Sequence, residues 1–200
     1  MARPRVDAEP FLGALPAAFT RQQALDAGLS DELLERLTRE EKLNRFAHGM
    51  YADERSGLLN FDLTEAHLRS PRATMCLTSA LARHDLVDDI PARIDLAIPR
   101  GDHRARISAP VQWHQYEPTT FEIGRTTIEL GRGLSMGLYD APRSIVDAFN
   151  PRMGIPREQA IEALRAWLRR RGSQPSTLMA IAKHWPHARA GLLSVLQVLL

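Results

Sequence analysis

The sequence predicts an α+β protein of two domains, and three observations lead to this fold class. Two short helices and a hairpin pattern occupy the first part of the chain, strand-like segments occupy the middle, and helical periodicity dominates the last fifty residues. We therefore expect a small N-terminal domain over residues 1–56 and, over residues 57–200, a mixed α/β domain that ends in a helical bundle.

The N-terminal domain contains two short helices separated by a glycine. Thr20 is a suitable N-cap for the RQQALDA segment, because its hydroxyl can accept a hydrogen bond from an amide of the first turn. Gly28 ends this helix, and Ser30 caps a second helix that we expect to extend to about Glu41.

The second helix has one apolar and one polar face. At the helical repeat of about 3.6 residues, the apolar face consists of Leu33, Leu34 and Leu37. The opposite face consists of Glu32, Glu35, Arg39 and Lys42, with Arg36 at its edge. We expect the leucines, together with Phe46, to form the core of the domain and the polar face to be free.

A hairpin follows the two helices. In LNRFAHGMYAD, apolar residues flank His48 and Gly49, which form a natural turn between two short strands. The earlier FLGALPAAF stretch supplies a first helix. Helix, glycine-containing turn, helix and hairpin is the order of a winged helix-turn-helix, so we predict that fold for residues 1–56.

The larger domain begins with helices and strands. We expect a helix over TMCLTSALARHDL, and a half-buried strand over RIDLAI, where apolar residues alternate between Pro91 and Pro99. A second helix covers PRSIVDAF. The remaining strand candidates are VQWHQY, FEIG, TTIEL and LSMGLY.

The last fifty residues are predicted to be wholly helical. One helix begins at Pro156 and closes at Gly172, and a second covers Ser176 to Trp185, where Pro186 stops it. The terminal segment from Ala188 is apolar on more than one face. Such a helix needs cover, either from its own domain or from another protein.

The order of these segments resembles a known family. FTRQQALDAGLSDELLERLTREEKLNRFAHGMY is similar to the N-terminal winged helix-turn-helix of AbiEi-type antitoxins. LTSALARHDLVDDIPARIDLAIPRG and YDAPRSIVDAF are similar to the body of the same family. These stretches cover most of the chain, and the resemblance lies in their order and spacing, because the individual motifs are made of ordinary residues.

The resemblance implies an antitoxin encoded beside a nucleotidyltransferase-like toxin of the AbiEii type. Such an antitoxin binds the promoter DNA of its own operon, represses that operon and counteracts the toxin. The sequence does not decide whether the antagonism needs direct contact with the toxin. An alternative also stays open, namely a stand-alone winged-helix transcriptional regulator whose larger domain binds a small ligand; a toxin gene next door would favour the first reading.

The winged helix suggests which residues touch DNA, because its second helix-turn-helix helix enters the major groove and its wing lies near the backbone or minor groove. We expect Arg36 and Arg39 to contact base edges or phosphates. The residues expected to position the DNA backbone are Arg21, Ser30, Lys42, Arg45 and His48, the last two from the wing.

The same charges have a structural explanation. Glu32 with Arg36 and Glu35 with Arg39 are i,i+4 pairs, each worth about 0.3–0.5 kcal/mol on a solvated helix. Residues 1–56 also carry eight Lys or Arg against ten Asp or Glu, and Asp31 repels phosphate at the groove end of the helix. A single copy should therefore bind weakly, and tight binding would need a dimer on DNA or a second basic surface.

A candidate for that second surface surrounds the RIDLAI strand. Its cations are Arg93, Arg100, His103, Arg104 and Arg106, which Asp95 and Asp102 offset in part. They would extend the DNA footprint or meet an acidic toxin surface, or they form a plain solvated loop.

We expect no enzymatic activity, no cofactor and no metal site. A nucleotidyltransferase needs paired carboxylates and a Gly-Ser loop, which do not accompany Asp95. A nuclease site from Glu65, Asp95 and Glu129 lacks the usual lysine. The other groups considered and set aside are a metal cluster of His84, Asp85, Asp88 and Asp89, a Cys76 nucleophile and a Ser79 nucleophile.

Composition indicates a cytoplasmic location. Cys76 is the single cysteine, so it has no partner for an internal disulfide. The N-terminal apolar stretch is short and contains Pro16, unlike a signal peptide, and the C-terminal run LLSVLQVLL is far below the roughly 20 residues that a membrane span needs.

Overall fold

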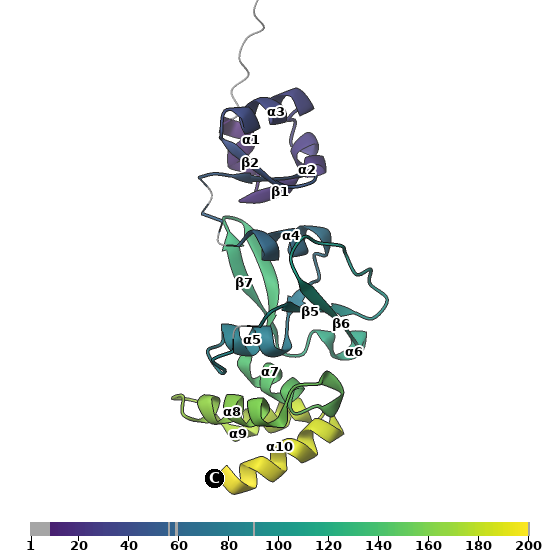
Figure 1. The fold of residues 1–200 in the computed structure, drawn as a ribbon, viewed down its shortest axis with the longest axis vertical. Helices are drawn as coiled ribbons and strands as arrows, with labels where there is room; N and C mark the ends of the chain where they lie inside the picture. The colour runs from purple at the N-terminus through teal and green to yellow at the C-terminus, as the bar shows by residue number, and fades with distance from the viewer. Residues whose placement is uncertain (1–8, 56, 59, 90, 200) are drawn as a thin grey trace, which may run out of the picture. The chain divides into compact units, whose positions relative to one another are not determined.

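The computed structural model describes residues 9–55, 57–58, 60–89 and 91–199. It contains α-helices and two β-sheets, so the expected α+β class is confirmed (Figure 1). The chain forms two compact units. Unit 1 consists of the described residues up to Pro71 with Ala105–Ser108 and Ile128–Met136, and unit 2 consists of Arg72–Arg104, Ala109–Thr127 and the described residues from Gly137 onward.

This division extends beyond the N-terminal domain expected from the sequence. Residue 56, where we placed the boundary, lies outside the described residues. The described residues between it and Pro71 belong to unit 1, and so do the later segments 105–108 and 128–136. Local sequence patterns do not reveal such membership, because it depends on which distant segments pack together.

Unit 1 contains a three-stranded antiparallel sheet and, before its last two strands, three helices. In the sheet, β3 lies between β1 and β2. The expected turn of the β2–β3 hairpin is present, and Gly49 there has a φ of +68°, which glycine adopts at little cost. The elements in chain order are α1 (Glu9–Ala14), β1 (Ala18–Thr20), α2 (Arg21–Asp26), α3 (Asp31–Arg39), β2 (Leu43–Ala47) and β3 (Met50–Asp53).

The apolar FLGALPAAF stretch is only partly helical, which corrects the expectation of a single helix. Helix α1 ends at Ala14, and the end of the stretch forms β1. The amide of Ala17 donates to the carbonyl oxygen of Arg132 at 2.7 Å, and β1 pairs with β3. These partners are distant in the chain, and they override the local helical tendency.

Side-chain caps begin the two helices α2 and α3, as the sequence indicates. The Thr20 hydroxyl accepts from the Gln23 amide at 3.2 Å, and the Gln23 side chain accepts from the Thr20 amide at 2.8 Å. The Ser30 hydroxyl accepts from the Leu33 amide at 3.2 Å. Helix α3 ends at Arg39, two residues before the expected end, where Glu41 has a left-handed φ of +56°.

The apolar face of α3 forms the core of unit 1. Leu34 and Leu37 are fully buried and pack with Phe19 of β1 and Tyr51 of β3. Phe46, which we expected in this core, instead packs against Phe61, with ring centroids 5.2 Å apart. The leucine face is thus confirmed, and the hairpin contributes Tyr51 to the cluster rather than Phe46.

A helix that the sequence did not lead us to expect, α4 (Phe61–Arg69), completes unit 1. The Asn60 side chain caps it by accepting from the Leu63 amide at 2.9 Å. Its buried Glu65 accepts from Arg69 Nε at 2.8 Å and from the Ser108 amide at 3.1 Å. This carboxylate therefore joins the 105–108 segment to α4.

The second sheet has the strand order β6-β5-β4-β8-β7. β5 runs parallel to β6 and antiparallel to β4, and β4 runs parallel to β8. The strand predictions over RIDLAI, VQWHQY, TTIEL and LSMGLY are confirmed. The strands are β4 (Thr74–Met75), β5 (Ile94–Pro99), β6 (Val111–Tyr116), β7 (Arg125–Gly131) and β8 (Leu134–Tyr139).

Two expectations for this region are wrong. TMCLTSALARHDL is not one helix, because Thr74–Met75 pairs with two other strands as β4 and the helix α5 covers only Leu77–Arg83. FEIG is not a strand, because Pro118 begins the short helix α6 (Pro118–Phe121) and a turn follows it. In both places, strand pairing or a proline decided against the local apolar pattern.

The C-terminal half of unit 2 is helical, as predicted. The terminal segment packs mainly within its own unit, since Ala188, Leu192, Val195 and Leu196 are buried there. Pro186 begins the last helix, whereas we had assigned it only to the end of the preceding one. The elements are α7 (Ala141–Ala148), the 3₁₀-helix η1 (Pro151–Met153), α8 (Arg157–Leu168), α9 (Pro175–Ala182) and α10 (Pro186–Leu199).

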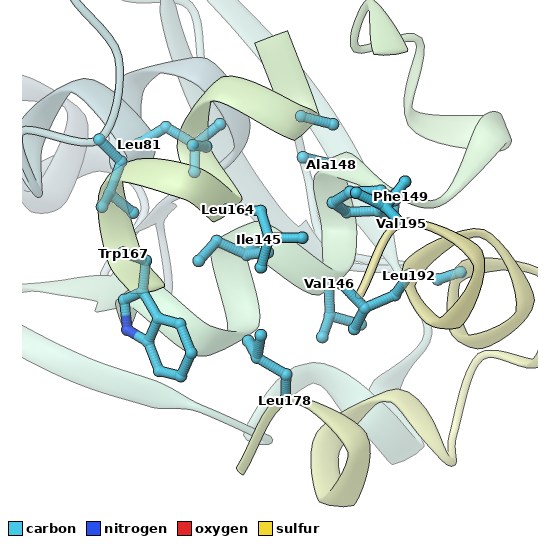
Figure 2. Packing of buried hydrophobic residues seen from close by; sticks show 14 of the residues in the cluster. Leu81, Ile145, Val146, Ala148, Phe149, Leu164, Trp167, Leu178, Leu192 and Val195 are labelled. Atoms are coloured by element: carbon cyan, nitrogen blue, oxygen red, sulfur yellow. The ribbon is translucent and has the colours of Figure 1, made fainter. Parts of the chain in front are cut away.

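These helices share one apolar core around α7. Figure 2 shows Ile145 of α7 beside Leu164 and Trp167 of α8, with Leu178 of α9 reaching toward them. Leu192 of α10 is fully buried in the same cluster. Burial of side chains of this size stabilises a fold by about 1.5–3 kcal/mol each.

A buried ion pair lies at the other side of α7. Arg143 and Asp147 are each 1% exposed, and Arg143 Nε donates to Asp147 Oδ1 at 3.0 Å. Arg143 Nη1 also donates to the carbonyl oxygens of Thr120, at 2.9 Å, and Ile123, at 2.6 Å. Tyr116 of β6 donates to the second Asp147 oxygen at 3.1 Å. Burial raises the pKa of Asp147, and Arg143 opposes that shift by stabilising the carboxylate.

Removing one charge of this pair should be costlier than removing both. We expect Arg143→Met to lower the free energy of unfolding by about 3–5 kcal/mol, because it leaves an uncompensated carboxylate in the core. Arg143→Met with Asp147→Leu should be more stable than Arg143→Met alone, as urea denaturation would measure. The exposed Arg157→Met is the control, and a double variant less stable than the single one would refute the explanation.

Candidate nucleic-acid interface

All seven residues that the sequence predicts for DNA contact lie in unit 1, on two helices and the hairpin. Arg21 begins α2, and Ser30 is the N-cap of α3. Arg36 and Arg39 are on the last turn of α3, and the remaining three follow it. These are Lys42, which directly precedes β2, Arg45 in β2 and His48 in the hairpin turn.

Two of these residues form hydrogen bonds that begin α3 or join α2 to α3. Arg21 Nε donates to Asp31 Oδ1 at 2.7 Å, and this hydrogen bond raises the pKa of Arg21 and lowers that of Asp31. The Ser30 hydroxyl is used by the α3 cap. The structure therefore gives both residues a role in the geometry of the helix pair.

Two further cations meet one acidic residue. Lys42 Nζ lies 3.1 Å from Glu40, and Arg36 Nε lies 3.9 Å from the other Glu40 oxygen. Arg36 is also the less accessible of the α3 arginines. Glu40 thus partly offsets the positive charge of Arg36 and Lys42, which the sequence predicts to contact DNA.

Arg39 and Arg45 differ from the other cations. Both are exposed, and neither forms an ion pair with any residue in the part of the chain that the structure describes. They line one open hollow of about 310 Å³, together with Glu35, Thr38 and Tyr51. The fold therefore brings an arginine of α3 and an arginine of β2 to one surface feature. The expected i,i+4 ion pair between Glu35 and Arg39 is absent among these described residues.

Two residues of this hollow, Thr38 and Tyr51, are not among those that the sequence predicts for DNA contact. Thr38 donates its hydroxyl to the Leu34 carbonyl oxygen at 2.8 Å, which is typical of a threonine inside a helix. Thr38 follows Glu35 by about one helical turn, and this spacing could have placed it on the polar face of the helix. Tyr51 comes from β3, so only the pairing of the strands brings it beside α3.

The second group of cations is divided between the two units. Arg93, Arg100 and Arg104 belong to unit 2, whereas Arg106 belongs to unit 1. Arg100 lies 2.6 Å from Glu117, and Arg93 Nη1 donates to Gln112 at 3.4 Å. The structure thus assigns local partners to two of these residues.

The residues considered for catalysis have structural partners as well. Asp95 Oδ1 lies 2.8 Å from His114 Nε2, and the Ser79 hydroxyl accepts from the Asp95 amide at 2.9 Å. His84 Nε2 is 2.8 Å from the Tyr139 carbonyl oxygen. Cys76 is fully buried, and burial raises the pKa of its thiol well above the ordinary value. Within the described residues, there is no group of three or more His, Cys, Asp or Glu side chains that could hold a metal ion.

Comparisons with known proteins leave the family of the chain open. No protein-family model matches it, and no curated protein matches it. Among solved structures, the chain is similar to the crystal structure of the RV2827C protein from Mycobacterium tuberculosis, at 14% identity and a TM-score of 0.48, over 95% of this chain and 79% of that one. A likeness of this size carries no conclusion about function. Within the described residues, no helix is both long and apolar enough to span a membrane.

Glu65, one of the residues considered for catalysis, gives a test of its structural role. Burial works against its charged form, but the hydrogen bonds from Ser108 and Arg69 outweigh burial and lower its pKa. Because the pKa of Glu65 is lower in the folded than in the unfolded protein, its carboxylate stabilises the fold at pH values above the unfolded-state pKa. This stabilisation is lost as pH falls through the folded-state pKa.

We expect Glu65→Gln to lower the free energy of unfolding by about 1–3 kcal/mol at neutral pH. The difference from wild type should shrink as pH falls below the ordinary glutamate pKa of about 4.3, and it should disappear only below the lowered pKa of the folded-state carboxylate. Urea denaturation across this pH range measures both, with the exposed Glu162→Gln as control. A difference that stays constant with pH would show that the charge of Glu65 is not responsible.

Proposed function

We propose that unit 1 contains a winged helix-turn-helix that binds duplex DNA, with α3 as the helix that enters the major groove. The order of α1, β1, α2, α3, β2 and β3, with a β1-β3-β2 sheet, supports this proposal. Helices α2 and α3 are separated by a short turn around Gly28, whose φ is +95°. The β2–β3 hairpin corresponds to the wing.

The observation that carries the proposal is the hollow lined by Arg39 and Arg45. Both guanidinium groups lack an acidic partner among the described residues, so both are available to phosphate or base edges. One comes from the groove helix and the other from the wing, which are the two elements that contact DNA in this motif. A solvated helix stabilised by its own ion pairs would instead place Arg39 on Glu35.

Acidic residues limit the strength of this interface. Glu35 lines the same hollow, and Glu40 offsets Lys42 and Arg36. A single copy therefore presents few unopposed cations, and the affinity of one copy for DNA should be modest. Two copies on a symmetric operator would double the number of contacts, so we propose that the protein binds DNA as a dimer.

Substitution of the two arginines tests the DNA proposal. Arg39→Gln and Arg45→Gln should each weaken binding to the promoter upstream of the gene by about tenfold, since a lost contact of this kind costs about 1–3 kcal/mol. Each lost phosphate contact should also reduce the salt dependence by about 0.9 in the slope of log K against log salt. Fluorescence anisotropy at several salt concentrations measures both quantities.

Two further variants make the test specific. Glu35→Gln should tighten binding, because it removes a negative charge from the hollow that we assign to DNA. Arg171→Gln, an exposed arginine of unit 2, should leave affinity unchanged. If neither Arg39→Gln nor Arg45→Gln alters affinity or salt dependence, the hollow is not the DNA site.

We further propose that the protein is an antitoxin of the AbiEi type, which represses its own operon and counteracts a nucleotidyltransferase-like toxin in the cytoplasm. The support is the sequence resemblance together with the arrangement of unit 1, which suits an operon repressor. The toxin partner would be the product of a neighbouring gene. A stand-alone regulator remains the competing function, and the absence of such a neighbouring gene would favour it.

Repression and antagonism should be separable in the full-length chain. We expect the double variant Arg39→Gln with Arg45→Gln to lose repression of a promoter reporter, because its DNA contacts are gone. The same variant, expressed from an independent promoter, should still restore growth of cells that produce the neighbouring nucleotidyltransferase-like protein. If wild-type protein does not restore growth, the antitoxin proposal fails while the DNA proposal is still judged by the binding measurements.

A further inference from the structure

Unit 2 contains a cavity of about 420 Å³ next to the buried ion pair of α7. Its wall includes Trp113 and Tyr116 of β6, Arg143 of α7, Arg152 of η1, and Trp185, which directly precedes α10. The volume lies in the range of about 300–1,000 Å³ that is typical of small-molecule sites and exceeds what a bare inorganic ion needs. The DNA-binding proposal does not involve this cavity.

The buried arginine has hydrogen-bonding capacity left at the cavity. Arg143 Nε donates to Asp147, and Nη1 donates to two backbone carbonyl oxygens. Nη2 donates to no residue in the described part of the chain, although Arg143 is 1% exposed and lines the cavity. A guanidinium held in a fixed position with one free nitrogen is a strong donor for an anion, because its orientation is already determined by the fold.

A second donor lines the same cavity. Asn150, a further residue of the cavity wall, is 7% exposed, and its side-chain oxygen accepts from the Arg152 amide at 3.2 Å. The side-chain nitrogen of Asn150 forms no hydrogen bond with any described residue. The two nearly buried side chains Arg143 and Asn150 thus each have a donor nitrogen without a protein acceptor in this part of the structure.

The charge of the cavity wall is positive. Asp147 neutralises Arg143, with Oδ1 3.0 Å from Nε, and Glu117 neutralises Arg100 at 2.6 Å. Arg152 is exposed and forms no ion pair with the described residues, so its charge is not offset. The cavity therefore favours an anion over a cation or a neutral molecule.

Aromatic rings supply the apolar part of the wall. The guanidinium carbon of Arg143 lies 4.2 Å from the centre of the Trp185 ring and 5.4 Å from that of Tyr116, which holds both rings in place. Trp113 adds a second indole to the cavity. Rigid aromatic side chains of this kind favour a planar ring in a ligand, because flat groups stack on them.

We propose that this cavity binds a small organic anion that carries a planar aromatic ring. Its anionic group is bound by Arg152, Arg143 Nη2 and the Asn150 side-chain nitrogen, and its ring contacts the tryptophans. Two kinds of molecule share this chemistry, namely nucleoside monophosphates and aromatic carboxylates. Binding of either kind would make unit 2 a ligand-binding part of the protein.

Calorimetric titration of the full-length protein tests the proposal and distinguishes the two sources. The probes are AMP and UMP for the first kind and salicylate for the second. Adenosine and inorganic phosphate each retain one half of the nucleotide. If AMP binds, each of them should bind at least about tenfold more weakly than AMP, because loss of one charge-assisted contact corresponds to roughly that factor. Saturable binding of nucleotides alone or of salicylate alone supports the proposal and names the source.

Arg152→Gln should weaken binding of the successful probe by about tenfold, because it removes the unopposed charge from an exposed position without disturbing the core. Arg189→Gln, an exposed arginine of α10 outside the cavity, is the matched control and should bind as wild type does. The protein has three tryptophans, and the indole N–H resonances of Trp113 and Trp185 should shift on binding while that of Trp167 in the helical core does not.

The proposal is overturned by any of three results. One is the absence of saturable binding by AMP, UMP and salicylate up to about 10 mM, which is weaker than any useful small-molecule site. The second is an affinity that Arg152→Gln leaves unchanged. The third is a pattern in which Trp167 shifts and the two cavity tryptophans do not.

Discussion

The buried pair of Arg143 and Asp147 is the constraint on which unit 2 depends. Two charges are removed from water here only because hydrogen bonds and their mutual attraction compensate for most of the lost solvation, so the residues that supply these contacts must stay in place. Arg143 binds the carbonyl oxygens of Thr120 in α6 and of Ile123 in the turn after it, and Asp147 accepts from Tyr116 of β6. The pair therefore couples α7 to the sheet and to the segment that leads into β7. It also explains how a buried cation can line the cavity.

Unit 1 is organised by a different kind of interaction. Its core is the leucine face of α3 against Phe19 and Tyr51, and its helices begin at the side-chain caps of Thr20 and Ser30. Polar contacts here are mostly on the surface, where ion pairs contribute about 0–1 kcal/mol each. Such pairs do little for stability, but they decide which cations are available to a ligand.

The arginines of this chain have different roles because their surroundings differ. Arg21 joins two helices through Asp31, and Arg143 is enclosed by aromatic rings and carbonyl oxygens. Arg39 and Arg45 have no acidic partner in the described residues, and neither has Arg152. The planar guanidinium suits all of these surroundings, because it can stack, bind a carboxylate in two places or present its edge to a phosphate. Both proposed binding surfaces follow from the arginines that the fold leaves without a carboxylate.

Local sequence patterns are enough to predict the α+β class, the cap and apolar face of α3, the β2–β3 hairpin with its turn at Gly49, four further strands and the helical end of the chain. These features depend on local periodicity and on residues that start or stop an element. Contacts between distant segments make Thr74–Met75 a strand, pair Ala18–Thr20 with β3 and bring segments 105–108 and 128–136 into unit 1. The same holds for the candidate sites: charge at Arg39 and Arg45 is visible in the sequence, whereas its lack of a partner and the juxtaposition with Tyr51 are not. Pairing between residues far apart in the chain sets these features, and a local pattern contains no record of that pairing.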